Sequence, residues 1–266
     1  MRVRPAADGD VAAIAAIAAA NGDQDAGGDP RYVAHLRTHG DFWVADDAGV
    51  VAGYCATRRV GAATMLCDLF VAPDRQGRGV GRRLLDHAFA EPGARFTFAS
   101  RDPRTLPLYI RYGMAPRWPL LYLTGPPVPI GHGAHARAVP AGEAVDAARR
   151  LGAADRETDV AFLAGGPGGH GIVIREGGDD GPVVAAGAAA PGVLAHLTVA
   201  ARADPAAAVP AATSVFSDPP ALCLPGAHPA VPRLLAAGWR ITAFDHHMSS
   251  SPGLVPETGV LSPSLC

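Results

Sequence analysis

The sequence predicts an α/β (α+β) protein of two tandem domains, each a mixed, mostly antiparallel sheet flanked by helices. Three observations lead to this fold class. Segments with strand-like and helix-like patterns alternate along the 266 residues. The strands on either side of residues 47–49 have the pattern of an antiparallel hairpin. The second half of the chain also repeats short stretches of the first half in the same order, which indicates a duplicated fold.

The first half of the chain accounts for one complete domain. Asp29 followed by Pro30 predicts a helix start, and Gly40 suits the end of that helix. Periodic apolar residues predict the other elements. In chain order we expect strand 3–6, helix 9–21, helix 30–39, strands 41–47, 50–59 and 64–73, a helix following residue 81, strand 95–100, helix 102–113 and strand 117–125.

Three echoes mark the second domain. They pair "VRPAADGDVAAI" (3–14) with "ARAVPAGEAVDA" (136–147), "MLCDLFVAP" (65–73) with "VLAHLTVAA" (193–201), and "LYIRYGM" (108–114) with "RLLAAGW" (233–239). Between the two halves lies "GPPVPIGHG", whose prolines and glycines are typical of a linker. The predicted organisation is therefore a domain at 1–124, a linker at 125–133, a second domain at 134–250 and a C-terminal tail at 251–266.

Composition limits the classes of function. The net charge of −2 offers no broad positive surface, so we expect no nucleic-acid partner. The four cysteines lie far apart without a CxxC pair, which argues against a metal site and against a disulfide scaffold. Asp8 and Asp10 interrupt the apolar N-terminal stretch, and no run reaches membrane-spanning length. We therefore expect a cytoplasmic protein without a membrane partner, while its oligomeric state stays open.

The stretch "DRQGRGVGRRLL" (74–85) carries the strongest chemical signal. A strand leads into it, three glycines follow within five positions, and a helix begins. Backbone N–H groups at a helix start lack internal partners, and glycines let the backbone curl around an anion. A plain tight turn would have the same pattern. A Walker loop is excluded because the chain has no lysine, and the glycine spacing differs from that of a Rossmann loop.

The longer stretch "LFVAPDRQGRGVGRRLL" (69–85) resembles the acetyl-CoA loop of the GNAT N-acetyltransferase superfamily. The family pattern Arg/Gln-x-x-Gly-x-Gly/Ala is matched by Gln76, Gly79 and Gly81. "VAP" matches the strand ending that precedes the loop, and "YIRYGM" matches the tyrosine helix downstream. The resemblance covers residues 1 to about 124 well and 134 to about 250 faintly, so it implies two tandem GNAT-like domains.

The resemblance implies acetyl-CoA as cosubstrate and assigns residues to it. The main chain of the preceding strand would pair with the pantetheine arm, and N–H groups of the loop would hold the pyrophosphate. Two loop arginines either reach the phosphates or remain solvated. The cofactor-binding residues expected on this basis are Leu69, Phe70, Val71, Gln76, Gly77, Arg78, Gly79, Val80, Gly81 and Arg82.

Two residues are candidates for catalysis. Tyr109 matches the tyrosine that protonates the departing CoA thiolate in this family, although an aromatic residue packed on a helix face is the alternative. Asp68 lies on the strand before the loop and is a candidate general base, directly or through water. A buried, hydrogen-bonded carboxylate is its alternative. The family's more often acidic position is Cys67 here, and Asp102 replaces an asparagine that commonly contacts CoA.

The second half lacks the cofactor residues. Pro205, Ala207 and Val209 stand where the first half has glycines, and Leu234 replaces the tyrosine. We therefore expect one catalytic and one degenerate domain, with transfer of an acetyl group from acetyl-CoA to a small-molecule amine. A non-catalytic acyl-CoA-binding or regulatory module is the alternative, and another acyl group or acceptor is a third option. The acidic loop with Asp23, Asp25 and Asp29 suits a cationic amine, but the sequence does not identify the acceptor.

Overall fold

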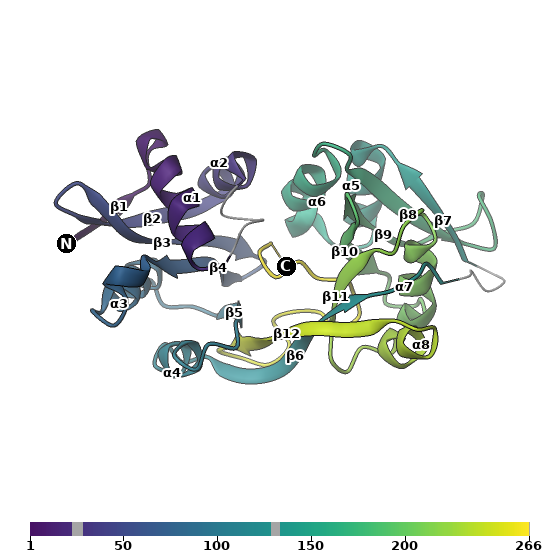
Figure 1. Cartoon of the computed structure of the whole chain (residues 1–266). Coiled ribbons are helices and arrows are strands. Elements are labelled where there is room, and N and C mark those ends of the chain that lie inside the picture. The colour runs from purple at the N-terminus through teal and green to yellow at the C-terminus, as the bar shows by residue number, and fades with distance from the viewer. Residues whose placement is uncertain (23–28, 129–133, 266) are drawn as a thin grey trace. The chain divides into compact units, whose positions relative to one another are not determined.

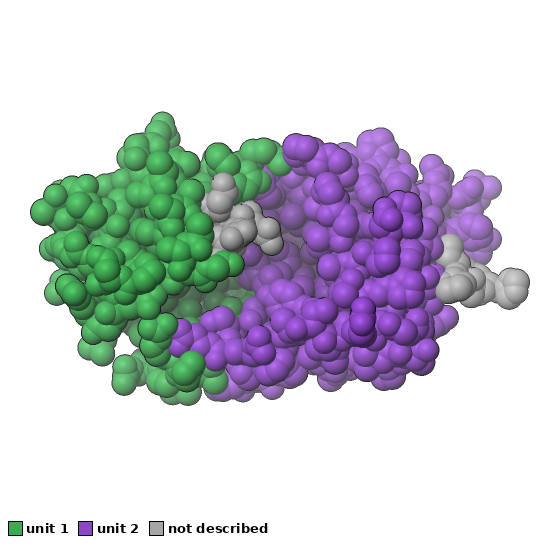
Figure 2. Space-filling model, in the orientation of Figure 1, with its two compact units in different colours: residues 1–98, 103–115, 248–254 green, residues 99–102, 116–247, 255–266 purple. Residues whose placement is uncertain are grey.

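A computed structural model describes residues 1–22, 29–128 and 134–265. The chain divides into two compact units, coloured separately in Figure 2. Unit 1 comprises residues 1–98, 103–115 and 248–254, and unit 2 comprises residues 99–102, 116–247 and 255–266. Each unit has its own set of buried apolar residues.

The two halves of the chain contain the same order of helices and strands (Figure 1). The first half runs β1(Arg2–Pro5), α1(Val11–Ala20), α2(Pro30–His39), β2(Gly40–Asp47), β3(Val50–Val60), β4(Ala63–Val71), α3(Val80–Ala88), β5(Arg95–Ala99), α4(Thr105–Ile110) and β6(Ala115–Thr124). The second half runs β7(Ala134–Val139), α5(Ala141–Arg150), α6(Glu157–Ala164), β8(His170–Glu176), β9(Val183–Ala190), β10(Val193–Val199), α7(Pro205–Thr213), β11(Ala221–Pro225), α8(Ala230–Ala236) and β12(Arg240–Ser249). Short 3-10 turns lie at Asp8–Asp10, Pro73–Arg75 and Ala154–Arg156.

In unit 1 the strands follow the order β1-β2-β3-β4-β5. Its pairs are antiparallel except for β4 and β5, which run parallel. The predicted hairpin is confirmed: Ala48 and Gly49, both with positive φ, join β2 to β3. The predicted helix start is confirmed as well, because Asp29 Oδ1 accepts a hydrogen bond from Arg31 N at 2.8 Å and Pro30 is the first helical residue.

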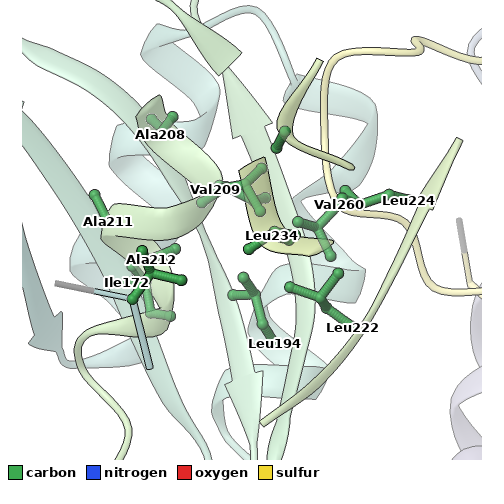
Figure 3. Packing of buried hydrophobic residues seen from close by; sticks show 14 of the residues in the cluster. Ile172, Leu194, Ala208, Val209, Ala211, Ala212, Leu222, Leu224, Leu234 and Val260 are labelled. Atoms are coloured by element: carbon green, nitrogen blue, oxygen red, sulfur yellow. The ribbon is translucent and has the colours of Figure 1, made fainter. Parts of the chain in front are cut away.

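In unit 2 the strands follow the order β12-β6-β11-β10-β9-β8-β7. The β10–β11 pair is parallel, and β6 adds to the far side of β11 in the antiparallel direction. Its main apolar core lies between this sheet and helices α7 and α8, and includes Leu194, Leu222 and Leu234 (Figure 3). A second cluster lies under α5 and α6 and is built largely from alanines.

A shared irregularity supports the duplication. In β4 the register with β3 shifts at Cys67, the extra residue between Leu66 and Asp68. In β10 the register with β9 shifts in the same way at Ala195, between Leu194 and His196. These two positions correspond in the sequence echo of 65–73 with 193–201. A β-bulge kinks its strand and is kept for a reason, so the same bulge in both halves indicates one ancestral strand. The mixed, mostly antiparallel fold class and the tandem organisation are thereby confirmed.

The compact units exchange segments that are distant in sequence. Residues 116–124, at the end of the domain predicted at 1–124, lie in unit 2 because β6 pairs with β11 from Leu120↔Pro225 to Thr124↔Ala221. Residues 248–254 lie in unit 1, where Ser250 N donates to Arg95 O at 2.9 Å. The predicted bounds thus follow chain order, whereas the packed units do not.

The predicted linker and tail are partly packed into unit 2. Within the linker, Val128 is buried and Trp239 Nε1 donates to Pro126 O at 2.8 Å, while residues 129–133 lie outside the described residues. Within the tail, the side chains of Val255, Val260, Leu261 and Leu265 are buried. In the sequence, both segments show only a few apolar residues among prolines and glycines, which is too weak a pattern to predict that they are buried.

Candidate functional site

The C-terminal half of β4 offers an open strand edge in unit 1. β4 pairs with β5 only from Thr64↔Arg95 to Leu66↔Thr97. On the other side, Ala72 N donates to Ala52 O at 3.0 Å, which fixes the alternation of hydrogen bonds toward β3. The main-chain groups of Phe70 therefore face β3, and those of Leu69 and Val71 face away from it. Of the three predicted strand residues, Leu69 and Val71 present their backbone to the open edge.

The glycine turn, residues 76–81, connects this edge to helix α3. Gly77 and Gly79 have φ of 74° and 79°, in the left-handed region that favours glycine. Gly79 is the N-cap of α3, no side chain caps this helix start, and the first helical bond runs from Arg83 N to Gly79 O. A Cβ at either glycine would meet no atom within 4 Å, so the space beside the turn is open. The start of α3 thus leaves room for an anion beside its first N–H groups, and anion binding there stays a prediction.

The side chain of Gln76 shapes the turn. Its Nε2 donates to Asn21 Oδ1 at 3.0 Å and to Val71 O at 3.2 Å, and its Oε1 accepts from Arg104 Nη1 at 2.8 Å. Asn21 Nδ2 also donates to Val71 O at 3.1 Å. The main-chain N–H of Gln76 donates to Pro73 O at 3.4 Å. The N–H groups that remain for a ligand therefore begin at Gly77, and Val71 contributes chiefly its N–H.

Sequence reasoning missed Asn21 and Arg104 as partners of Gln76. Asn21 is the only asparagine of the chain, and it follows α1 directly. That rarity was the available signal for Asn21. Arg104 has no comparable signal, because the stretch 74–85 itself contains four other arginines. The predicted phosphate-binding arginines Arg78 and Arg82 are both exposed at the turn and the start of α3.

Helix α4 carries the predicted acid, Tyr109, and brings the preceding residue, Leu108, close to Gly81 at the glycine turn. A methyl group on Gly81 would lie 3.9 Å from Leu108 Cδ2 and 3.9 Å from Leu69 Cδ2. Tyr109 follows in α4, with only 6% of its surface exposed. The helix begins at Thr105 without a side-chain cap, so the expected start at Asp102 lies too early.

A second tyrosine, Tyr112, fixes α4 to α3. Its hydroxyl lies 2.6 Å from Asp86 Oδ1 and 3.0 Å from the Arg82 carbonyl oxygen. Burial and the hydrogen bond to Asp86 raise the pKa of Tyr112 above its usual value. Its proton is therefore committed to Asp86, so Tyr112 acts as a positioning residue for α4.

Asp68 is nearly enclosed on β4, with 5% of its surface exposed. Expected alternation would place Cys67 and Leu69 on one face, but the bulge at Cys67 breaks the alternation there. Burial raises the pKa of the Cys55 thiol on β3, and the nearby carboxylates of Asp68 and Asp41 raise it further. The role of Asp68 as general base stays a prediction.

Few of the described residues bear on the predictions about the acceptor and about a metal. Asp29 is used as the cap of α2, and Asp23 and Asp25 lie outside the described residues. Within residues 1–22, 29–128 and 134–265, no group of three His, Cys, Asp or Glu side chains could hold a metal ion. Among the same residues, no helix is long and apolar enough to span a membrane.

Comparisons with known proteins agree with this architecture. The family model described as an acetyltransferase (GNAT) domain matches residues 38–113, which include β4, the glycine turn and α4. No curated protein matches the chain.

Solved structures of similar fold cover nearly the whole chain. An unconfirmed acetyltransferase from Pyrococcus horikoshii covers 100% of this chain and 95% of its own, with 13% identity and a TM-score of 0.74. A tandem GNAT protein from the clavulanic acid biosynthesis pathway covers 95% and 99%, with 15% identity and a TM-score of 0.67. A GCN5-related N-acetyltransferase from Anabaena variabilis covers 93% and 72%, with 14% identity and a TM-score of 0.62. At these identities the likeness concerns the fold. Residues 38–113 thus match the acetyltransferase (GNAT) domain model, and the chain shares its fold with a solved tandem GNAT protein.

Proposed function

We propose that this protein transfers an acetyl group from acetyl-CoA directly to a small-molecule amine, and that unit 1 performs the reaction. The observation that carries the proposal is the pairing of an open strand edge at Leu69 with the uncapped glycine turn. A pantetheine arm can add to a strand edge, and a pyrophosphate can bind N–H groups at a helix start. The GNAT match over residues 38–113 supports the same assignment.

The cofactor residues divide into two groups. Leu69 and Val71 would offer main-chain groups to the pantetheine arm, and the N–H groups from Gly77 to Gly81 would hold the pyrophosphate. Arg78 and Arg82 lie exposed at the turn, where long-range attraction to phosphates speeds association. When bound, acetyl-CoA supplies the activated acetyl thioester.

Tyr109 is the proposed general acid. A tyrosine hydroxyl has an ordinary pKa of about 10, so it holds its proton at neutral pH and can deliver it to a thiolate. Its neighbour Tyr112 is bound to Asp86 and holds the helix in place. The proton of the amine acceptor must leave before or during transfer, and Asp68 is the proposed base for it.

A thiol-release assay with acetyl-CoA tests this function. The panel should contain polyamines, aminoglycosides, amino acids and peptide N-termini. We expect acceptor-dependent thiol release with at least one amine, and none with the Gly79→Val variant. Binding of acetyl-CoA without release across the panel, together with an unaffected Tyr109→Phe variant, would instead identify a non-catalytic acyl-CoA-binding module.

A further inference from the structure

Unit 2 contains a strand-edge slot that corresponds to the open edge of β4. β10 and β11 pair in parallel only at Val193↔Ala221 and Leu194↔Leu222, just as β4 and β5 pair only near their starts. In the echo of 65–73 with 193–201, Leu197 of β10 corresponds to Leu69. Ala200 N donates to Val184 O at 2.8 Å, the counterpart of the bond from Ala72 N, so Leu197 faces away from β9. We call the space beyond these two pairs the β10–β11 slot.

The slot is filled by the C-terminal tail of the same chain. Leu197 N donates to Val260 O at 3.1 Å, and Val260 N donates back to Leu197 O at 3.1 Å. On the other side, Leu261 N donates to Cys223 O of β11 at 3.1 Å. The tail therefore bridges both walls of the slot through its backbone.

Side chains anchor the tail on both sides of this contact. Val260 is fully buried and lies among Leu222, Leu224 and Leu234 in the core of unit 2 (Figure 3). Leu261 and Leu265 are 4% and 2% exposed. Beyond them, the buried Arg156 side chain donates to Leu265 O.

Arg156 is held by its own partner. Its Nη2 lies 3.0 Å from Asp159 Oδ2, and the side chains of both residues are almost fully buried. A buried charge without a partner destabilises the folded state, and here Asp159 supplies that partner. The ion pair therefore holds the Arg156 guanidinium in place to bind the backbone carbonyl of the tail.

In unit 2, the start of α7 corresponds to the glycine turn of unit 1, and a side chain of the same chain binds it. Asp204 corresponds to Gln76, and its Oδ1 accepts a hydrogen bond from Ala206 N at 2.9 Å at the start of α7. Pro205, the first helical residue, offers no N–H. The start of α3 has neither feature. A carboxylate at this position satisfies the helix start and repels a phosphate.

We propose that the β10–β11 slot is a peptide-binding site whose ligand is the chain's own segment 259–261, and that this segment closes unit 2 to a thioester cofactor. The tail replaces a pantetheine arm at Leu197, and Asp204 replaces the pyrophosphate at α7. Unit 2 is thereby completed by its own chain, while unit 1 keeps its edge open for a ligand.

Hydrogen exchange of the unmodified full chain gives the first test. The Leu197 amide should be strongly protected without any ligand, whereas the Leu69 amide should exchange faster and become slower only when acetyl-CoA is added. Fast exchange at Leu197 in the free protein, or slowing at Leu197 upon adding acetyl-CoA, would overturn the proposal. An unchanged Leu69 amide would count against cofactor binding in unit 1 and leave the tail site intact.

A glycine pair gives the second test. A Cβ at Gly259 would lie 2.4 Å from Leu197 O, so Gly259→Ala pushes the tail off the strand, whereas a Cβ at Gly142 meets nothing within 4 Å. Gly259→Ala should speed exchange at Leu197 and Leu261 by about tenfold or more, because a net backbone hydrogen bond is lost at each. Gly142→Ala should leave both unchanged. Adding a synthetic peptide of residues 255–266 to the Gly259→Ala protein should restore protection at Leu197. No change in Gly259→Ala, or no restoration by the peptide, would contradict the assignment.

Discussion

Two tyrosines three positions apart have different surroundings in unit 1. Tyr109 lies buried in α4, and Tyr112 binds Asp86 and the Arg82 carbonyl. If Tyr109 is the general acid, Tyr109→Phe should lower kcat by about 10²–10⁴-fold with little change in acetyl-CoA affinity.

Tyr112→Phe is the matched control for that substitution. It removes a hydrogen bond worth about 1 kcal/mol of unfolding free energy and should leave kcat within a few-fold of the parent. Steady-state kinetics and chemical denaturation of both variants separate the two roles. If the Tyr109→Phe enzyme has the same kcat as the Tyr112→Phe enzyme, Tyr109 contributes only to packing and is not the general acid.

The glycine turn allows a similar paired substitution. Gly79 and Gly49 have φ of 79° and 89°, and a Cβ at either would meet nothing within 4 Å. Valine should therefore introduce comparable backbone strain at both positions, of about 1–2 kcal/mol or more. Only Gly79→Val adds bulk beside the start of α3, so only this variant should lose acetyl-CoA binding by calorimetry. Equal affinity for acetyl-CoA in both variants would show that the pyrophosphate does not bind at the glycine turn.

Among the elements, α3 and α7 were distinguished from the sequence alone. The three glycines before α3 predicted an open helix start. Their counterparts at α7, Pro205, Ala207 and Val209, predicted a closed one, because the effect of glycine and proline on the backbone is local. The cap by Asp204 was not predicted, although an aspartate before a proline is the same signal that identified Asp29. The bulge at Cys67 could not be predicted, because it depends on how β4 registers against β3.

Strand β12 should make the stability of unit 2 depend on pH. Burial, with a smaller contribution from the positive charge of Arg117, lowers the pKa of His247 from 6.5 to about 4. The neutral ring is favoured by folding, so its contribution is complete above pH 6.5 and is lost as the pH falls toward 4. The loss is about 3 kcal/mol at most for a shift of this size.

His247→Phe isolates this contribution. Burial raises the pKa of the neighbouring Asp245, which gives the opposite pH dependence, so the comparison must be between variant and parent. Denaturant unfolding at pH 7 and pH 4.5 should show a smaller acid-induced loss of unfolding free energy in the variant. An identical loss in both proteins would assign the pH dependence to other groups.

For the whole molecule, the sequence predicted the duplicated order of elements but not the packing of chain ends. The echoes depend on local patterns that each half retained. The placement of β6 in unit 2 and of residues 248–254 in unit 1 depends on which strand edge each segment meets. A strand such as "PLLYL" has the same apolar pattern whichever neighbour it pairs with, so no local signal distinguishes the alternatives. For the same reason, the sequence did not predict that Val260 and Leu265 of the tail are buried.

The central claim is that two copies of one fold provide one cofactor site. In unit 1 the strand edge at Leu69 and the glycine turn are open, and in unit 2 the tail and Asp204 fill the equivalent positions. Calorimetric titration of the full chain with a non-hydrolysable acetyl-CoA analogue tests this directly. We expect a stoichiometry of about one per chain, and no binding in Gly79→Val. A stoichiometry near two, or binding that survives Gly79→Val, would contradict the assignment of the cofactor to unit 1.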